Sequence, residues 1–345
     1  MFLSQEFTYS KVMVESLVEI SRMQGEISAK VFSLSDRLFY RQQSLAESAH
    51  FSTKIEGNQL TLKQVTETLG QKTHLKASRE LKEVINYAKA RQFIFESNIN
   101  INKINLLKSH DILLTGILLK SIRGKYRQLQ NAIKDSKTQK VIYLPPEWTD
   151  VEDLMKNLFK IAFLKKPSIA EAVIDSGIFH FHFESIHPFL DGNGRLGRLW
   201  STNILRHGGL SFVEFVAFEK YHELNRKTYY EQLHALQGDI FYNISARLDL
   251  TPWLEYWIKG LLYSIKEAYS RIENLSFEKE ELFLEKRLSM GINLFKSHKK
   301  ISAEQYQLLA NIGRTQAVED LNKLIHLKII KKIGGGRSTV YILME

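Results

Sequence analysis

Apolar residues recur at helical spacing along most of the chain. Helices are expected through residues 1 to about 100, with a restart at 61–64, where Thr61 and Gln64 fit a capping-box pattern, and another helix at 79–94. A later stripe of apolar or small residues predicts a helix that buries one side and leads into His187. This stripe comprises Ile169, Ala170, Val173, Ile174, Gly177, Ile178 and Phe181. With only five prolines in the chain, the pattern predicts a mainly α protein.

The helical rhythm breaks between Arg123 and Pro146. Residues 141–143 (Val-Ile-Tyr) favour a strand, and residues 135–137 (Asp-Ser-Lys) favour a turn. We therefore expect a β-hairpin here. The edge of such a hairpin can align an extended segment of another protein by main-chain pairing; a surface hairpin with no substrate role is the alternative.

The last eighty residues are predicted to form a separate piece. Two short helices are expected at 301–310 and 315–327, joined by 311–314, and strands are expected at 329–333 and 338–343 around the glycines at 334–336. A helix pair followed by a hairpin is typical of a winged helix. Nine Lys or Arg stand against three acidic residues between positions 296 and 337, which gives +6 of the net +10 of the chain.

A winged helix of this composition is a candidate for DNA binding. It would place Arg314, Thr315, Gln316 and Glu319 at a major groove and Arg337 near a phosphate. Glu319 and Asp320 are unfavourable beside a polyanion, and winged helices also pair proteins. Both partners therefore stay open.

Composition adds limits. The 345 residues suffice for two or three domains, and the absence of cysteine excludes disulfides and thiol chemistry. No leader or run of about 18 apolar residues is visible, so we expect a cytoplasmic protein without a membrane span. The net charge of +10 favours acidic partners such as nucleotides or nucleic acid.

The most informative stretch is residues 187–198, which reads His-Pro-Phe-Leu-Asp-Gly-Asn-Gly-Arg-Leu-Gly-Arg. Gly192 and Gly194 allow successive backbone N–H groups to face one anion. Arginines at 195 and 198 can share one helix face and hold phosphate oxygens. Asp191 is suited to bind Mg²⁺ and His187 to accept a proton. The alternative is a loop that closes a helix hairpin with its charges in solvent.

This stretch resembles the signature of the Fic family, HPFx[DE]GNGRxxR, and fills each of its fixed positions. The resemblance implies a Fic-type helical core whose β-hairpin lies over the site as a flap. It also implies adenylylation (AMPylation), in which a hydroxyl of a target protein attacks the α-phosphate of ATP and pyrophosphate leaves. A Doc-type kinase has Lys at the position of Gly194, so the glycine favours AMP transfer.

The resemblance also implies a role for each motif residue. His187 is the general base. Asn193 and the backbone N–H groups from Gly192 through Gly194 to Arg195 hold the phosphates. Asp191 binds Mg²⁺, and the guanidinium groups of Arg195 and Arg198 hold the leaving pyrophosphate. Phe189 is expected to anchor the loop in the core.

A second motif lies upstream at 52–57, Ser-Thr-Lys-Ile-Glu-Gly. Residues 42–56 are expected to be helical, with Gly57 as the left-handed residue that ends the helix, and Ser52 and Glu56 on one face. The motif resembles the Fic inhibitory pattern [ST]xxxE[GN], which implies that Glu56 reaches Arg198 and occupies the guanidinium that the γ-phosphate needs. An ordinary helix-end glutamate is the alternative.

Three further features carry weaker expectations. Fic relatives place a tyrosine against adenine near Tyr229, although tyrosines in helices are more often packed. Trp253 and Trp257 predict a core helix at 250–262 that ends the Fic core. His180 and His182 with Glu184 could suggest a metal site, but positions two apart on a helix point about 200° apart, so packing is favoured.

The sequence thus predicts an N-terminal helical region with an inhibitory helix (1–100), a Fic core (101–262) and a winged helix (263–345). The expected function is a self-inhibited protein adenylyltransferase that uses ATP and Mg²⁺ on a hydroxyl of a target protein. The alternatives are a nucleotide-sensing DNA-binding regulator and an enzyme that removes AMP. The target is not readable from the sequence, and a homo-oligomer stays open.

Overall fold

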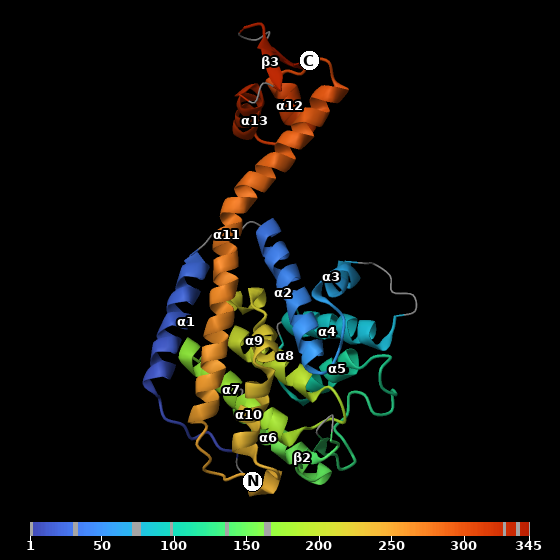
Figure 1. Ribbon diagram of the computed structural model, residues 1–345, viewed down its shortest axis with the longest axis vertical. Helices are drawn as coiled ribbons and strands as arrows, with labels where there is room; N and C mark the ends of the chain where they lie inside the picture. Colours follow the sequence, from blue (N-terminus) through green and yellow to red (C-terminus); the bar gives the residue numbers. More distant parts are fainter. Residues whose placement is uncertain are drawn as a thin grey trace. The chain divides into compact units, whose positions relative to one another are not determined.

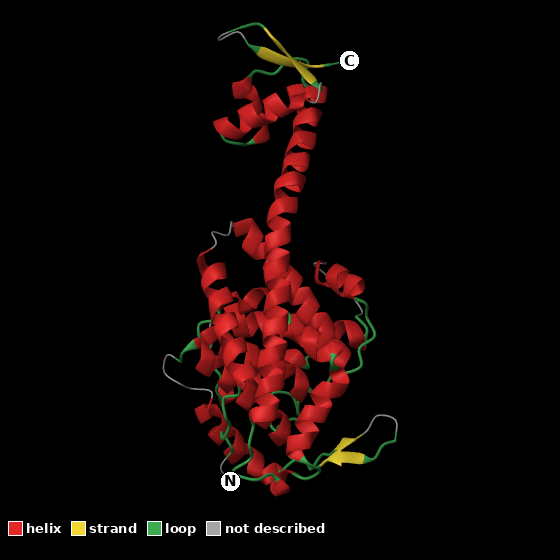
Figure 2. Cartoon of the chain, turned by 60° about the vertical axis from the view of Figure 1, so that its left-hand side comes forward, coloured by secondary structure: helices red, strands yellow, loops and turns green. Residues whose placement is uncertain are grey.

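The computed structural model describes residues 3–29, 34–70, 77–96, 99–134, 138–161, 167–326, 329–335 and 339–344. The chain divides into two compact units, Met1–Tyr269 and Ser270–Glu345, which we call the first and second unit. Helices dominate both, as the cartoon in Figure 2 shows, and the predicted mainly α fold is confirmed.

The first unit is built from ten helices and the start of an eleventh. In chain order they are α1 (Lys11–Ala29), α2 (Leu34–Ile55), α3 (Leu62–Gly70), α4 (Arg79–Glu96), α5 (Lys103–Leu113), α6 (Val151–Ile161), α7 (Ile169–Ile186), α8 (Asn193–His207), α9 (Phe218–Leu224), α10 (Arg226–Gln237) and α11 (Thr251–Ser297) (Figure 1). Short 3-10 segments lie at η1 (Trp148–Asp150), η2 (Ser211–Phe215) and η3 (Phe241–Asn243).

Helix α7 forms the centre of the first unit. It begins at a capping box in which the Ser168 side chain accepts from the Glu171 amide and the Glu171 carboxylate accepts from the Ser168 amide. From Ala172 to Ile186 every residue except Asp175 is buried. The expectation of a single buried side is therefore wrong, because α1, α6 and α8 all pack against this helix.

The tryptophans of α11 fasten that helix to α7. The Trp253 indole donates to the Gly177 carbonyl at 2.8 Å and the Trp257 indole donates to the Ser176 hydroxyl at 2.9 Å. A side chain at Gly177 would collide with Trp257, so the glycine allows the close approach. The predicted helix end near residue 262 is wrong, because α11 continues without a break to Ser297.

Helix α2 ends where the sequence predicts. Gly57 has φ of +99°, the left-handed region that favours glycine. Thr61 and Gln64 then form the expected reciprocal capping contacts before α3. The C-terminal end of α2, which carries the second motif, is thereby fixed in direction.

A two-stranded antiparallel hairpin interrupts the helices, as predicted. It pairs β1 (Ile133–Lys134) with β2 (Val141–Tyr143); the expected turn at 135–137 lies outside the described residues. Tyr143 is buried, and its hydroxyl donates to the Ser185 carbonyl of α7 at 2.8 Å. The base of the hairpin is therefore attached to the central helix, close to the first motif.

The second unit combines the end of α11 with α12 (Ala303–Ala310), α13 (Arg314–His326), β3 (Ile330–Ile333) and β4 (Val340–Leu343). The strands pair antiparallel. Ile301 precedes α12, because its backbone pairs with Tyr341 and Ser302 caps the helix. Leu327, Gly336, Arg337 and Ser338, which the sequence analysis assigned to the end of the second helix and to the wing, lie outside the described residues.

The small core of the second unit gathers apolar residues of all these elements, among them Leu288, Phe295, Leu321 and Ile330. Asp320 is fully buried beneath them. It accepts from the Arg287 guanidinium at 2.8 Å and from the Tyr306 hydroxyl at 3.3 Å. Burial of this carboxylate against Arg287 removes it from the exposed face of α13.

Within the described part of the chain, we find no helix with both the length and the apolar character needed to cross a bilayer.

Several imidazoles are buried in the first unit. Burial lowers the pKa of His110 to about 4, of His180 to about 3 and of His182 to about 4. The hydrogen bond from His182 Nε2 to the Ser4 carbonyl, at 2.6 Å, opposes the shift only in part. These rings are neutral in the folded protein at pH 6 and above.

This burial predicts a stability loss in mild acid. Below pH 6.5 the unfolded chain protonates His182 and the folded chain does not, until the pH reaches about 4. As the pH falls from 6.5 to about 4, this group should therefore lower the free energy of unfolding by about 1.4 kcal/mol for each pH unit. The contribution is fully present above pH 6.5. His182→Gln should make the dependence of the unfolding free energy on pH shallower by about one proton between pH 6.5 and 4.5, measured by denaturant titration. Replacement of the exposed His234 by Gln is the control. An equal slope in all three proteins contradicts the prediction.

Candidate functional site

The junction of α7 and α8 holds the residues of the first motif. His187 is the C-terminal cap of α7, in left-handed conformation with φ of +51°, and its amide donates to the Phe183 carbonyl at 3.0 Å. Arg127 fixes the turn from outside. Its Nε donates to the His187 carbonyl at 3.0 Å, and its amide donates to the Pro188 carbonyl at 2.9 Å. The imidazole is therefore held at a defined point beside the start of α8.

The protonation state of His187 suits a base. Burial lowers its pKa to about 4, while the backbone of Glu184 acts in the opposite direction. At neutral pH the ring is uncharged and has a free lone pair. It can accept a proton from a neighbouring hydroxyl.

The loop between the two helices is closed from inside. The Asn193 side chain accepts from the Phe189 amide at 2.9 Å and donates to the Phe189 carbonyl at 2.8 Å. Phe189 is fully buried and stacks on His110 with ring centroids 3.9 Å apart. The expectation for Phe189 matches this packing. The Asn193 side chain, however, is occupied by the loop, so we assign it to shaping the loop rather than to holding a phosphate.

Two glycines make the start of α8 approachable. Gly192 is its N-terminal cap, with φ of +85°. A Cβ on Gly194 would lie 2.4 Å from Glu56 Oε1 and 2.9 Å from Arg198 Nη1. The carboxylate of Glu56 therefore lies directly against the first turn of α8. Backbone N–H groups and the helix dipole favour an anion at this position.

The two arginines of the motif turn to different partners. Arg195 is 3% exposed and donates through Nη2 to Asp191 Oδ1 at 2.7 Å. The other Asp191 oxygen, Oδ2, lies 3.6 Å from Arg79 Nη2. With its side chain 31% exposed, the Asp191 carboxylate can be reached from solvent, and its oxygens are the donor type that Mg²⁺ prefers.

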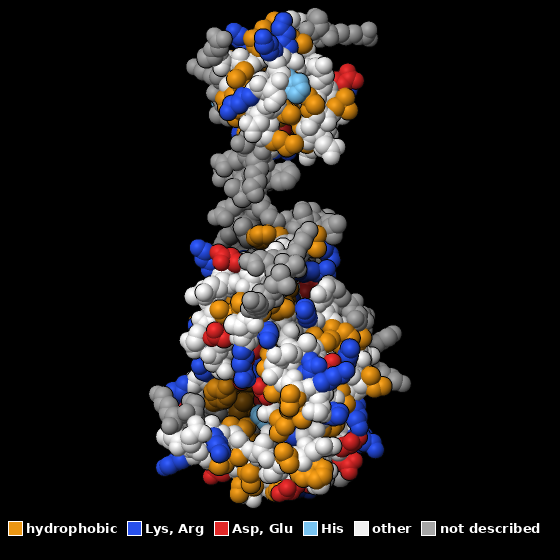
Figure 3. Space-filling view, turned by 90° about the vertical axis from the view of Figure 1, so that its right-hand side faces the viewer, with side chains coloured by type: hydrophobic (Ala, Val, Ile, Leu, Met, Phe, Trp, Pro, Cys, Tyr) orange, Lys and Arg blue, Asp and Glu red, His pale blue; other side chains and the backbone are white. Residues whose placement is uncertain are grey.

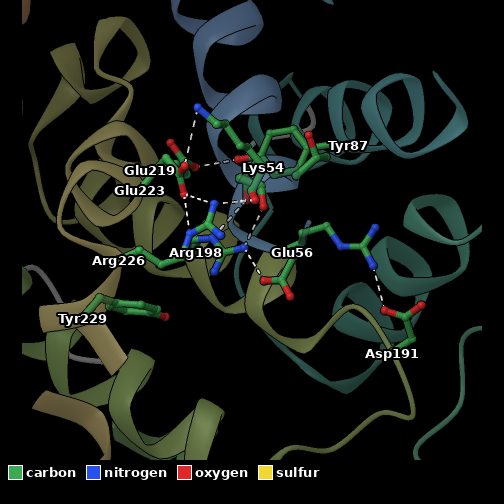
Figure 4. Close-up of polar contacts among 12 residues, drawn as sticks. Lys54, Glu56, Tyr87, Asp191, Arg198, Glu219, Glu223, Arg226 and Tyr229 are labelled. Atoms are coloured by element: carbon green, nitrogen blue, oxygen red, sulfur yellow. Dashed lines mark hydrogen bonds and ion pairs between the residues drawn. The ribbon is translucent and has the colours of Figure 1, made fainter. Parts of the chain in front are cut away.

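Arg198 is 3% exposed and contacts the second motif (Figure 4). Its Nε donates to Ser52 Oγ and its Nη2 to the Ser52 carbonyl, each at 3.0 Å. Nη2 also donates to Glu56 Oε1 at 2.7 Å. Burial opposes the charge, but the Glu56 carboxylate raises the pKa of Arg198 above its ordinary value. The contact between Glu56 and Arg198, 142 positions apart in the chain, is thus present in the structure.

Tyr229 lies deeper than the sequence analysis expected. It is 1% exposed and its hydroxyl is 2.7 Å from His180 Nε2, so its ring packs in the core of the first unit. The next residue of α10, Tyr230, is 46% exposed. Of the two rings, that of Tyr230 is the one with surface available for contact with an adenine ring.

The histidines of α7 face different neighbours, as their spacing requires. His180 points to Tyr229, whereas His182 points to the Ser4 carbonyl. Between them and the motif, Glu184 lies against Gly197, where a Cβ would be 2.4 Å from its Oε1. Burial raises the pKa of Glu184 to about 8, so this carboxyl is protonated at neutral pH. The arrangement favours packing over a shared metal site.

The sequence analysis missed Arg127 and His110. Arg127 holds the His187 turn, and His110 supports both the Phe189 ring and the Asp191 carbonyl, at 3.2 Å. Arg127 lies in the segment where the helical rhythm breaks, which was its only signal. A lone His110 in an amphipathic helix gave none.

Figure 3 shows a hollow in the face of the first unit, with hydrophobic side chains and a histidine visible inside it.

Residues 100–205 match the Fic/DOC family. The chain is 26% identical over 249 residues to "Protein adenylyltransferase Fic" of Nematostella vectensis, which covers 65% of this chain and 54% of that protein. It is 40% identical over 79 residues to "Probable protein adenylyltransferase aq_aa38" of Aquifex aeolicus, 23% of this chain and 24% of that protein. The matches thus span about half and about a quarter of the length of these relatives.

Among solved structures, a Fic family protein from Desulfovibrio desulfuricans has the same fold, with a TM-score of 0.69, 23% identity and coverage of 98% of this chain and 97% of the other. A Fic domain containing signalling protein from Bacteroides thetaiotaomicron gives a TM-score of 0.58 at 16% identity, over 76% of this chain and 98% of the other.

Proposed function

We propose that this protein, whose residues 100–205 form a Fic domain, is a protein adenylyltransferase that is restrained by its own Glu56. The observation that carries the proposal is the neutral His187 beside the glycine-rich start of α8. A base lies next to a site for phosphates, and both are fixed by the core.

The reaction needs one proton acceptor at the attacking atom. The hydroxyl oxygen of a target side chain bonds to the α-phosphorus of ATP, while the bond from that phosphorus to the pyrophosphate oxygen breaks. The hydroxyl proton passes to His187. The low pKa of this ring keeps it neutral before the reaction.

The phosphates of ATP are held by the start of α8. Its backbone N–H groups and the Arg198 guanidinium offer positive charge in a buried setting, where a charge-assisted hydrogen bond is strong. Arg195 orients Asp191. Asp191 would hold Mg²⁺, and that ion would supply positive charge for the leaving pyrophosphate.

The hairpin of β1 and β2 presents the target. Val141 is 56% exposed and Ile142 is 37% exposed, so the outer part of β2 is open to another chain. The Asn131 side chain, just before β1, donates to the Phe189 carbonyl at 3.3 Å. Pairing of a target segment with this hairpin would place a Ser, Thr or Tyr hydroxyl near His187.

Glu56 restrains this reaction by occupying a phosphate position. Its carboxylate lies against Gly194 and pairs with Arg198 Nη2 at 2.7 Å. A carboxylate and a γ-phosphate carry the same sign and need the same donors. ATP bound beside Glu56 would have its α-phosphate misaligned.

In this proposal residues 1–100 regulate, residues 101–262 catalyse, and residues 263–345 form a separate winged-helix module. ATP as the consumed nucleotide favours a cytoplasmic location. The alternative enzymatic activity is hydrolytic removal of AMP from a target, with Glu56 orienting the water. Incubation with α-labelled ATP separates the two, since only the forward enzyme labels a protein.

A second function is favoured by one observation in the second unit. Asp320 faces inward against Arg287, which leaves Arg314, Thr315, Gln316, Glu319 and Lys323 on the exposed face of α13. Exposed Lys331 and Lys332 lie on β3, and Lys and Arg side chains of this unit are visible in Figure 3. We propose that this face binds duplex DNA through phosphate contacts.

Replacement of His187 by Ala tests the chemistry. The variant lacks the proton acceptor but keeps the start of α8, so AMP transfer should fall by ~10²–10⁴-fold, while the Kd for ATP changes little. Transfer is measured with α-labelled ATP and by intact mass. Wild-type rates in His187→Ala would refute the assigned base.

A double-mutant cycle tests the restraint. Glu56→Gly frees Arg198 and should raise AMP transfer roughly 5- to 150-fold, the range of typical coupling energies of ~1–3 kcal/mol. Arg198→Ala should abolish the gain in the Glu56→Gly background, because it removes the group over which carboxylate and phosphate compete. If Glu56→Gly is no faster than wild type, Glu56 is an ordinary helix-end residue.

Salt dependence tests the DNA proposal. Binding of the full chain to a duplex should weaken steeply with salt, and the slope of log K against log[salt] should fall by about one in each of Arg314→Ala and Lys332→Ala. The control is Lys227→Ala on the first unit, whose side chain is 89% exposed. Absence of binding at low ionic strength would limit the module to protein contacts.

A further inference from the structure

The last turn of α2, which Glu56 directly follows, is held by two arginines from elsewhere in the chain. Arg198 donates to the Ser52 carbonyl at 3.0 Å. Arg226, 172 positions from Lys54, donates through Nη2 to the Lys54 carbonyl at 2.8 Å. These carbonyls belong to the helix end, where intrahelical partners run out and the helix dipole favours a cation.

Arg226 is itself oriented by a buried acid. Its Nε donates to Glu223 Oε2 at 2.7 Å, and the Glu223 side chain is 9% exposed. Glu223 Oε1 also lies 3.6 Å from the Lys54 ammonium. Figure 4 shows Lys54, Glu223 and Arg226 gathered beside Arg198. The carbonyl and the side chain of one residue, Lys54, are thus both tied to the α9–α10 corner.

Arg226 occupies a position that its own helix does not favour. It is the first residue of α10, and a cation at a helix N-terminus opposes the dipole of that helix. Its guanidinium instead reaches the opposite pole of α2. The benefit of this arginine therefore lies in the contact with α2.

We propose that Arg226 is a positioning residue that holds Glu56 on Arg198, with Glu223 as the group that orients it. The inference rests on the proposed restraint by Glu56 and names what sets its strength. When a γ-phosphate takes Arg198, the helix end loses its bonds to that arginine. Arg226 then remains as the attachment that returns Glu56 to the site.

Activity of four full-length variants tests this role. Arg226→Ala should raise the kcat of AMP transfer roughly 2- to 10-fold, less than Glu56→Gly, because one partly exposed charged hydrogen bond is lost. Arg226→Lys, which can still donate to the Lys54 carbonyl, should stay near wild type. Arg41→Ala is the matched control: Arg41 also ties α2 to a carboxylate, Glu214, at 2.8 Å, and its side chain is 48% exposed. Arg41→Ala should give no gain. A gain cannot come from loss of folding.

The double variant Glu56→Gly/Arg226→Ala gives the decisive comparison. With Glu56 absent, removal of Arg226 should add no further gain. If Glu56→Gly activates but Arg226→Ala matches Arg41→Ala, the positioning role is overturned and the restraint stands. If the gain in kcat of the double variant equals the product of the two single gains, Arg226 acts independently of Glu56 and the inference fails.

Hydrogen exchange supplies a readout that does not depend on activity. The amides of Glu56, Gly57 and Asn58 bond to the Thr53 and Lys54 carbonyls at 3.0–3.1 Å. Arg226→Ala should speed their exchange, with Arg226→Lys and Arg41→Ala near wild type. Unchanged exchange in Arg226→Ala overturns the inference whatever the transfer rates are. If exchange is faster in Arg226→Ala but Glu56→Gly shows no activation, the proposed restraint is overturned, and with it the role of Arg226 in that restraint.

Discussion

The buried guanidinium of Arg198 is the constraint on which the arrangement of the first unit depends. At 3% exposure this cation cannot be solvated by water, so it needs partners within the protein or a ligand. The hydroxyl and carbonyl of Ser52 and the carboxylate of Glu56 satisfy it. The end of α2 therefore packs against α8, and the two motifs, distant in sequence, contact each other at the Arg198 guanidinium.

Close approach at that point depends on glycines and on a rigid loop. Gly194 leaves the space that the Glu56 carboxylate fills, and Asn193 closes the loop by bonding both polar groups of the Phe189 backbone. Because the Phe189 ring is packed on His110, the loop cannot shift without disturbing the core. A site of this kind places a base and an anion position with little freedom. Such preorganisation is what the proposed transfer of AMP requires.

Charged contacts also hold the end of α2, the segment proposed to restrain the reaction. Glu223 and Arg226 are removed from the motif in sequence, yet they bond to the same helix end that Arg198 contacts. In the proposed restraint, the strength depends on all contacts of this helix end, and the contact of Glu56 with Arg198 is one of them. In the second unit the pair of Arg287 and Asp320 acts differently: it buries an acid, and the exposed face of α13 becomes more basic.

The sequence by itself determined the elements and the identity of the central groups. The Thr61 capping box and Gly57 predicted two helix ends correctly, because these are local effects of hydrogen bonding and φ. The resemblance of 187–198 and 52–57 to Fic motifs pointed to His187, Arg198 and Glu56 as the groups to consider. Local pattern, however, does not report which side of a helix meets which neighbour.

Tertiary structure decided the rest. Long-range packing buried α7 on nearly all sides and placed Tyr229 in the core with Tyr230 outside. It also brought Arg127 to the His187 turn and Arg226 to the Lys54 carbonyl, across 60 and 172 positions. A side chain that bonds a distant backbone carbonyl leaves no periodic signal in its own segment. Such contacts exist only once the helices have packed, and they set the position of each group that the sequence had named.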